Sequence, residues 1–234
     1  MKSFIRTIAA SSLAISVLVG TEVTSNAASV TVDPTPTWLG YMNVSEIPSH
    51  GGAYVFGSGW GTADLNANWS GPVLTLSPNT IGDPNPFWYT PAGGPGSVGN
   101  KIMDASMYVE TTGTYVGTTL TFEGKVLANT LVGNVDANGN GWTSVAFIKD
   151  FAPDFSSFNT VTAPLVNGLF SISMATINDP ARHVQYGFET IGPDVWVTDV
   201  APYGSIQITQ VPEPGTLALL ALGLGVSAYI RRRQ

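Results

Sequence analysis

The fold is decided by Thr118-Thr119-Leu120-Thr121-Phe122-Glu123-Gly124-Lys125-Val126-Leu127-Ala128. Apolar side chains (Leu120, Phe122, Val126, Ala128) alternate along it with polar ones (Thr119, Thr121, Glu123, Lys125). Side chains of a strand point alternately to the two faces of its sheet. The stretch therefore predicts a strand with one buried and one wet face, as in an antiparallel sheet.

The same alternation recurs on both sides of this stretch. It is found in residues 168–176, 184–190 and 204–210, and residues 143–149 are apolar on both faces in their middle, as in a central strand. Shorter strand candidates are 30–32, 39–44, 53–57, 73–76, 103–110 and 195–200. Residues 77–99, rich in Pro and Gly, predict a long ordered loop, and no segment carries a helical apolar stripe. We expect an all-β domain over 28–210, a two-sheet antiparallel sandwich of the jelly-roll kind.

Charge and composition exclude several classes of function. The chain has 234 residues and no Cys, which excludes disulfides and thiolate metal sites. Residues 28–211 contain four basic and fourteen acidic side chains, a net charge of −10. A surface this acidic repels phosphate backbones, so we expect no nucleic-acid partner.

The first 27 residues are typical of a signal peptide. Lys2 and Arg6 precede a short apolar run over 8–20, and small residues at the end of Ser25-Asn26-Ala27 suit cleavage after Ala27. Cleavage after Ala28 fits nearly as well. The alternative is an uncleaved membrane anchor, for which thirteen apolar positions are short.

Residues 211–234 form a second terminal signal with three parts. Pro212-Glu213-Pro214 comes first, an apolar stretch over 216–230 follows, and Arg231-Arg232-Arg233 comes last. The apolar stretch predicts a transmembrane helix of about 22 Å, a length that flanking arginines can extend by snorkelling. The arginine cluster favours a cytoplasmic C-terminus, with the domain outside.

These three parts, in this order, resemble the PEP-CTERM sorting signal. The resemblance implies recognition by exosortase, a membrane-embedded processing enzyme of Gram-negative bacteria that make extracellular polysaccharide. It further implies export, transient residence in the inner membrane, and a final place at the cell surface or in the extracellular matrix. The alternative is an ordinary tail anchor with a chance Pro-Glu-Pro.

The second half of the domain also resembles carbohydrate-binding modules of the jelly-roll type. The likeness rests on Gly117-Thr118-Thr119-Leu120-Thr121-Phe122, on Val184-Gln185-Tyr186-Gly187-Phe188 and on Trp196-Val197-Thr198-Asp199-Val200. It implies polysaccharide as a partner and a structural calcium at Asp199. The other acidic candidate, Asp136-Ala137-Asn138-Gly139-Asn140-Gly141, begins like an EF-hand loop but has Phe147 at position 12, so we expect a plain hairpin turn.

Aromatic side chains are the candidate sugar-binding residues, because sugar rings stack on flat aromatic faces. Trp60, Trp69, Trp88 and Tyr89 lie in Gly-, Pro- and Asn-rich surroundings, where rings can be exposed as a binding platform. The alternative is that these rings cap the core under a long loop.

Catalytic patterns are missing from the sequence. His50 and His183 are the only histidines, no nucleophile elbow or phosphate loop occurs, and Glu110, Glu123 and Glu189 sit on separate predicted strands. We expect no enzyme, no obligatory cofactor, and an exported envelope or matrix protein that binds polysaccharide. The alternatives are a sandwich-fold glycan hydrolase or lyase, and a matrix protein that assembles with itself.

Overall fold

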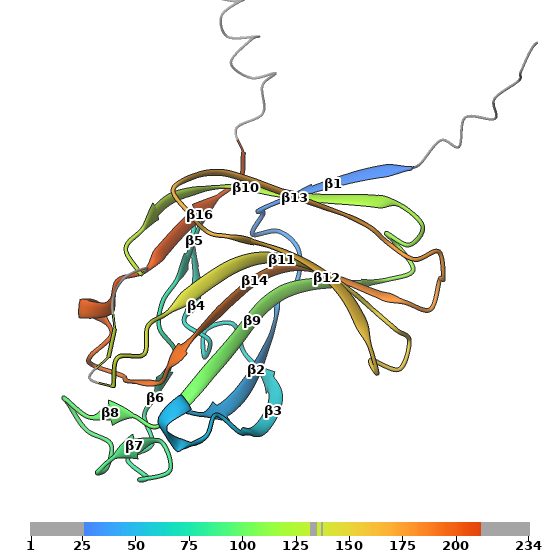
Figure 1. Ribbon diagram of the computed structural model, residues 1–234. Helices are drawn as coiled ribbons and strands as arrows, with labels where there is room; N and C mark the ends of the chain where they lie inside the picture. The colour runs from blue at the N-terminus through green and yellow to red at the C-terminus, as the bar shows by residue number, and fades with distance from the viewer. Residues whose placement is uncertain (1–25, 132–134, 137, 212–234) are drawn as a thin grey trace, which may run out of the picture.

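The computed structural model describes residues 26–131, 135, 136 and 138–211. Two sheets of six strands face each other across one core, and no α-helix occurs within the described ranges (Figure 1). This confirms the predicted all-β sandwich. The predicted signal peptide, apart from Asn26 and Ala27, and the predicted tail residues 212–234 lie outside the described residues.

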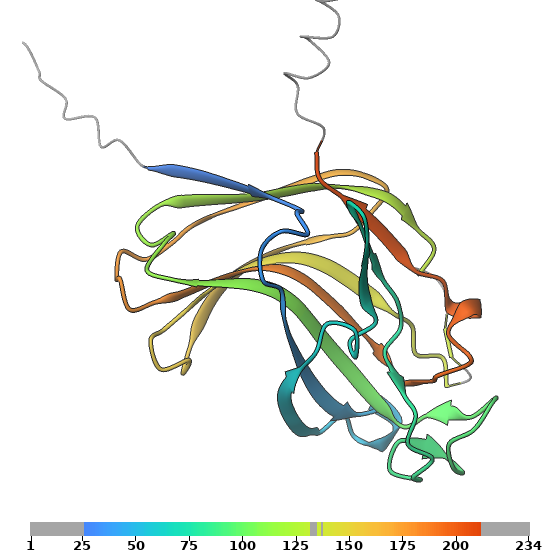
Figure 2. The same ribbon diagram turned by 180° about the vertical axis from the view of Figure 1, so that it is seen from behind.

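Sheet A is built around the long strand that decides the fold. It contains β10 (Thr119–Asn129), β1 (Ala27–Thr31), β13 (Gly168–Ala175), β16 (Ile206–Thr209), β5 (Val73–Leu76) and β4 (Ala67–Ser70). One edge of β10 pairs with β13; the other pairs with β1 in its first half and with β16 in its second. The β1–β10 pair is parallel and the other pairs of the sheet are antiparallel. Both ends of the described chain therefore lie on sheet A (Figures 1 and 2).

Sheet B is antiparallel throughout. Its order is β12 (Phe158–Pro164), β11 (Thr143–Phe151), β14 (His183–Pro193), β9 (Lys101–Thr112), β2 (Leu39–Glu46) and β3 (Tyr54–Trp60). As predicted from its apolar run, β11 is an inner strand, between β12 and β14. The strand β12 was not predicted: five of its seven residues are exposed, and Val161 and Ala163 are only half-buried, so the strand has no clear apolar face.

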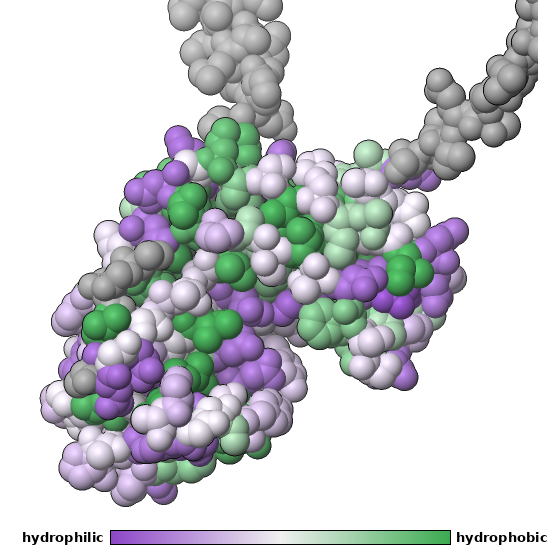
Figure 3. Space-filling model, viewed as in Figure 1, coloured by the Kyte–Doolittle hydropathy of each residue, from purple (hydrophilic) through white to green (hydrophobic). Residues whose placement is uncertain are grey.

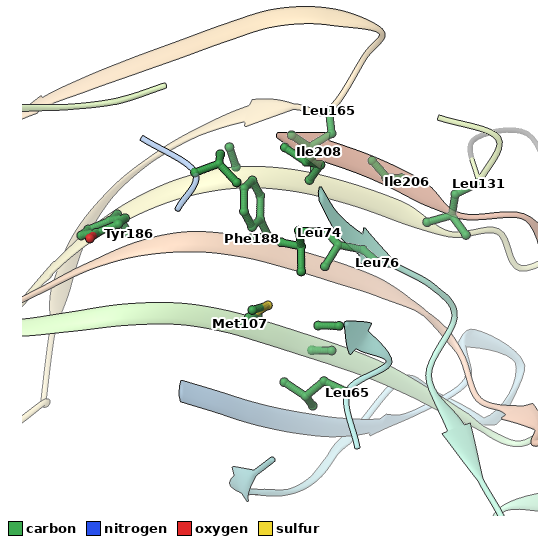
Figure 4. Packing of buried hydrophobic residues seen from close by; sticks show 14 of the residues in the cluster. Leu65, Leu74, Leu76, Met107, Leu131, Leu165, Tyr186, Phe188, Ile206 and Ile208 are labelled. Carbon is green, nitrogen blue, oxygen red and sulfur yellow. The ribbon is translucent and has the colours of Figure 1, made fainter. Parts of the chain in front are cut away.

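The core lies between the two sheets and takes one face of each. Figure 4 shows Leu74 and Leu76 from β5, Ile206 and Ile208 from β16, and Phe188 from β14 converging there. Phe122 of β10 is fully buried against Phe170, Tyr186 and Phe188, with ring centroids 5.3–5.4 Å apart. The apolar face predicted for residues 118–128 is thus the inner face of sheet A.

One loop prediction and one strand prediction need correction. Residues 77–99 contain three two-residue strands, β6 (Thr80–Ile81), β7 (Tyr89–Thr90) and β8 (Val98–Gly99). The strand predicted over 195–200 ends early: β15 (Val195–Trp196) pairs with β6 and is followed by turns and the 3-10 turn η2 (Ala201–Tyr203). The Asp199 N–H donates to the Trp196 carbonyl at 2.8 Å, and the turn that this bond closes ends the strand. A second 3-10 turn, η1 (Pro48–His50), joins β2 to β3.

Candidate functional site

The outer face of sheet B, which points away from sheet A, carries a cleft of about 800 Å³. In Figure 3 the molecular surface is indented below and to the right of centre, under the lobe that contains the β11–β12 turn. Five strands and that turn supply the lining: Leu39, Tyr41, Asn43, Asp104, Ser106, Tyr108, Glu110, Lys149, Phe151, Phe155, Phe158, Thr160, Thr162, Gln185 and Glu189. A volume of this size is typical of a small-ligand site, or of a few residues of a polymer.

Strand register places the lining residues in rows that cross the sheet. One row runs from Thr160 on β12 through Lys149 and Gln185 to Glu110 on β9. A second row crosses the sheet further along β14. It joins Glu189 on β14 to Ser106 on β9 and then to Tyr41 on β2. Because side chains two residues apart in a strand share a face, these rows form one continuous polar surface.

Gly187 occupies the row between these two, in the middle of the sheet. It pairs with Phe147 of β11 and Tyr108 of β9. A Cβ atom at this position would fall 2.1 Å from the Met107 carbonyl oxygen, so a larger residue requires β14 and β9 to move apart. The glycine keeps these strands close and adds no side chain to the floor of the cleft.

Partly exposed aromatic side chains border the cleft. Tyr41 is 37% exposed, Phe155 49% and Phe158 50%. Phe155 stands in the β11–β12 turn with φ +57°, the left-handed region that bulky residues rarely adopt. Its ring stacks on His183 at 4.3 Å between centroids. Backbone strain of this kind concentrates at functional sites, so the exposed position of this ring is a pointer to ligand contact.

A charged network occupies the part of the cleft nearest β2. The Lys149 ammonium donates to Glu189 Oε2 at 2.7 Å. Asp104 lies close by and accepts from Asn43 Nδ2 at 3.4 Å, and its Oδ1 is buried with no hydrogen-bond partner among the described residues. Burial, together with the nearby Glu189 carboxylate, raises the pKa of Asp104 to about 6, while Lys149 acts in the opposite direction.

A second network lies near the β11–β12 turn and centres on Glu110. Its Oε2 accepts from Gln185 Nε2 at 2.6 Å, and its Oε1 lies 3.7 Å from His183 Nδ1. The same ring nitrogen lies 2.9 Å from the Thr112 hydroxyl. The structure thus brings Glu110 and Glu189 to one cleft, whereas Glu123 lies on β10 of the other sheet.

The four aromatic residues predicted as a platform do not gather in one place. Trp88 packs edge-on against Phe87 and Phe56, and Trp69 packs against Trp38, each ring partly buried against the core. Trp60 borders two shallow hollows beside β3, and its Nε1 donates to Ser58 Oγ. For these three, the alternative of rings that cap the core fits the packing.

Tyr89 has to be removed from the predicted platform. It is fully buried, so its ring cannot reach a ligand. Its hydroxyl lies 2.6 Å from the Ile81 carbonyl and 2.9 Å from the Val195 carbonyl. Burial raises its pKa, and the ring instead ties the 77–99 segment to β15. Proline-rich surroundings carry no information on which rings this segment encloses.

The predicted calcium residue, Asp199, lies beside a small cavity of about 110 Å³ that Asp136 and Asp194 also line. Asp199 Oδ2 accepts the Gly96 N–H at 2.6 Å, and Oδ1 accepts the Thr198 hydroxyl at 2.9 Å. Within the described ranges, no group of three or more Asp, Glu, His or Cys side chains is placed to hold a metal ion. Calcium at Asp199 stays a prediction.

The Asp136 loop turns the chain as a hairpin. Asp136 N–H donates to the Asn140 carbonyl, Val135 bridges Gly141, and Gly139 adopts φ +78°. Asp136 Oδ1 accepts the N–H groups of Asn138 and Asn140, as in an Asx turn.

Sequence reasoning missed most of the cleft. The missed residues include Tyr41, Tyr108, Lys149, Phe155 and Phe158. One signal was present on the polar face of the predicted strand 103–110, which carries Asp104, Ser106, Tyr108 and Glu110. Ser and Thr would make such a face soluble, so an aromatic ring and two carboxylates on it indicate a candidate site. Which strands lie beside it is a matter of topology, and that was not readable from the chain.

Comparison with known proteins gives one match. Residues 210–233 match the family model described as the PEP-CTERM protein-sorting motif. Neither the curated proteins nor the solved structures give a match. The matched motif confirms the resemblance of Pro212-Glu213-Pro214 and Arg231-Arg232-Arg233 to that signal and indicates a protein that is exported and sorted by exosortase. Both clusters, and the helix predicted over 216–230, lie outside the described residues. Within the described ranges, no helix has the length and apolar character needed to span a membrane.

Proposed function

We propose that this exosortase-sorted chain is a non-catalytic envelope or matrix protein of a Gram-negative bacterium, and that it binds polysaccharide in the cleft of sheet B. The observation that carries the proposal is the cleft itself, where exposed rings and hydrogen-bonding side chains share one surface. Sugars offer both an apolar ring face and many hydroxyl groups, and such a mixed lining meets both requirements.

The placement of the cleft supports this role. Val211, which leads into the sorting motif, follows β16 of sheet A, whereas the cleft lies on the outer face of sheet B. A domain still joined to the membrane through the tail would hold sheet A closer to the attachment point and leave the cleft accessible to glycan.

A glycan hydrolase or lyase is the second candidate, favoured by the carboxylates that share the cleft. Asp104 and Glu189 are diagonal neighbours on adjacent strands, a spacing of about 7–8 Å between Cα atoms, and hydrolases use two carboxyl groups in an acid–base pair. Two contacts argue against it: Glu189 is held by Lys149 at 2.7 Å, and Asp104 Oδ1 is enclosed in protein. Both observations favour a binding role over catalysis.

Retention on glycans tests the proposal. The exported protein is incubated with exopolysaccharide from the producing species, and bound protein is measured after washing. We expect Tyr41→Ala and Phe158→Ala, both at exposed rings, to weaken retention by about thirtyfold together, since stacking on aromatic rings contributes about 1 kcal/mol per ring. Trp88→Ala, at a ring outside the cleft, is the matched control.

Three results would change the assignment. Loss of retention in Trp88→Ala alone would move the site to the platform predicted from sequence. Release of reducing ends or of unsaturated sugars would establish a hydrolase or lyase. Failure to bind any glycan, combined with concentration-dependent association of the protein, would favour self-assembly.

A further inference from the structure

The charge of the cleft limits which polysaccharide it can hold, if the cleft binds polysaccharide as proposed above. Three carboxylates, Asp104, Glu110 and Glu189, and one ammonium, Lys149, line it. Lys149 is committed to Glu189 through a 2.7 Å contact with both side chains less than one-fifth exposed. The net charge that remains for a ligand is therefore negative.

Glu110 is more exposed than Glu189, with 23% of its side chain accessible against 18%. Its partners are the neutral amide of Gln185 and the His183 ring, and no lysine or arginine of the described ranges forms an ion pair with it. Phe151 is the strand neighbour of His183, and Phe155 stacks on that ring. A carboxylate beside aromatic rings attracts an ammonium group twice, through a charge-assisted hydrogen bond and through the π faces.

Asp104 supplies a second negative position at the far end of the cleft. It lies on β9 six residues before Glu110, which corresponds to about 20 Å along the strand at about 3.4 Å per residue. Its Oδ1 lacks a hydrogen-bond partner among the described residues. Because Asp104 Oδ1 is enclosed, its charge attracts the repeated amino groups of an extended polymer from a distance, while Glu110 is placed to contact them. Both carboxylates repel a polyuronate.

We propose that the cleft selects a polysaccharide with free amino groups, a polymer of amino sugars that are at least partly unacetylated, over acidic glycans. The inference rests on the proposed function and names its ligand class. The acidity of the domain acts in the same direction, because it repels polyanions before contact.

The test compares three polymers that differ in charge. Glucosamine oligomers carry ammonium groups, their N-acetylated counterparts have the same backbone without the charge, and oligouronates are acidic. Affinities of the exported protein are measured by isothermal titration at mildly acidic pH, where the amino groups are protonated, and at two salt concentrations. We expect the amino polymer to bind about tenfold more tightly than the acetylated one, and the oligouronate not to bind.

Glu110→Gln keeps the shape of the side chain and removes the charge. It should reduce affinity for the amino polymer by about tenfold and leave affinity for the acetylated polymer unchanged. Glu123→Gln, which removes the same charge from β10 of sheet A, is the matched control and should change neither. Urea midpoints of both variants show whether they fold.

The outcomes separate the two proposals. Equal affinity for the amino and acetylated polymers, or preference for the oligouronate, overturns the selection of amino groups and leaves polysaccharide binding intact. Equal losses in Glu110→Gln and Glu123→Gln reveal general attraction of a polycation to an acidic protein, which also overturns it. Absence of binding to all three polymers, and to the native exopolysaccharide, contradicts the proposed function itself.

Discussion

At the scale of single residues, the carboxyl group of Asp194 stands out. The residue is 2% exposed, and its Oδ1 accepts the Lys101 N–H at 3.0 Å. Its Oδ2 is buried without a partner among the described residues. Burial raises the pKa of Asp194 to about 7, with the Lys101 N–H acting against the shift.

This raised pKa predicts how stability depends on pH. In the unfolded chain Asp194 ionises near its ordinary pKa, whereas the folded protein holds the proton until about pH 7. The folded state therefore binds more protons between these values, and stability falls as pH rises from about 4 to about 7. Asp194→Asn should remove this loss and raise the free energy of unfolding at pH 8 by at most about 4 kcal/mol.

Urea unfolding at pH 5 and pH 8 measures this effect, with Asp64→Asn, an exposed site, as the matched control. A pH slope that survives in Asp194→Asn would show that other groups cause it.

The calcium prediction at Asp199 is tested by thermal unfolding. If calcium binds in the neighbouring cavity, adding it should raise the melting temperature of the wild type and not of Asp199→Asn.

At the scale of the elements, one buried ion pair holds the connection between β13 and β14. Asp150 of β11 is fully buried; its Oδ1 accepts from Arg182 Nε at 2.7 Å and its Oδ2 accepts the Ile177 N–H at 2.8 Å. Arg182 also donates to the Asp150 carbonyl at 2.8 Å. These contacts fasten residues 177–182 to a strand of sheet B and so fix the start of β14, where Gln185 lines the cleft and His183 stacks on Phe155.

Arg182→Met should lower the free energy of unfolding by about 3–5 kcal/mol, because it leaves the Asp150 carboxylate buried without its cation. Adding Asp150→Asn to that variant should recover part of the loss. Urea denaturation of the wild type, Arg182→Met, Asp150→Asn and the double variant completes the double-mutant cycle. If Arg182→Met alone were no less stable than the wild type, the pair would have no role in holding this connection.

The closely spaced β9–β14 pair leads to a second expectation at this scale. Gly187→Ala would place its Cβ against the Met107 carbonyl, and the strands must separate to relieve the clash. We expect a loss of about 1–3 kcal/mol, the usual cost of overpacking. Thermal unfolding measures it, with Gly59→Ala on β3 as the control, because the nearest atom to a Cβ there lies 3.9 Å away. Equal stability of the two variants would contradict the close approach.

At the scale of the whole molecule, the sandwich and the sorting motif are connected through Val211, next to β16. The other described end, β1, starts at Ala27, so the predicted signal-peptide cleavage after Ala27 falls at the first residue of that strand. The chain beyond cleavage would enter sheet A directly. Both predicted processing sites therefore adjoin the same sheet, on the opposite side of the molecule from the cleft.

This arrangement predicts what changes in the motif will do. Replacing Pro212 and Pro214 with Ala should block processing and leave the full-length chain in the membrane fraction, because prolines hold the junction extended for the enzyme. Pro202→Ala, in η2, is the control. Fractionation and immunoblotting measure the distribution. Surface delivery of the doubly substituted chain at the normal level would show that the Pro-Glu-Pro segment is not what exosortase reads.

The sequence alone determined the class of the fold and the sorting signal of the protein, since both depend on patterns local to the chain. Alternation in residues 118–128 predicts the inner face of β10, and the match at 210–233 depends on contiguous residues. Only the tertiary structure decided the site. The cleft takes Tyr41, Glu110, Lys149 and Glu189 from four strands that are distant in sequence, and strand order and register brought them together. It also decided that Tyr89 is buried, because exposure of a loop residue depends on what packs over it.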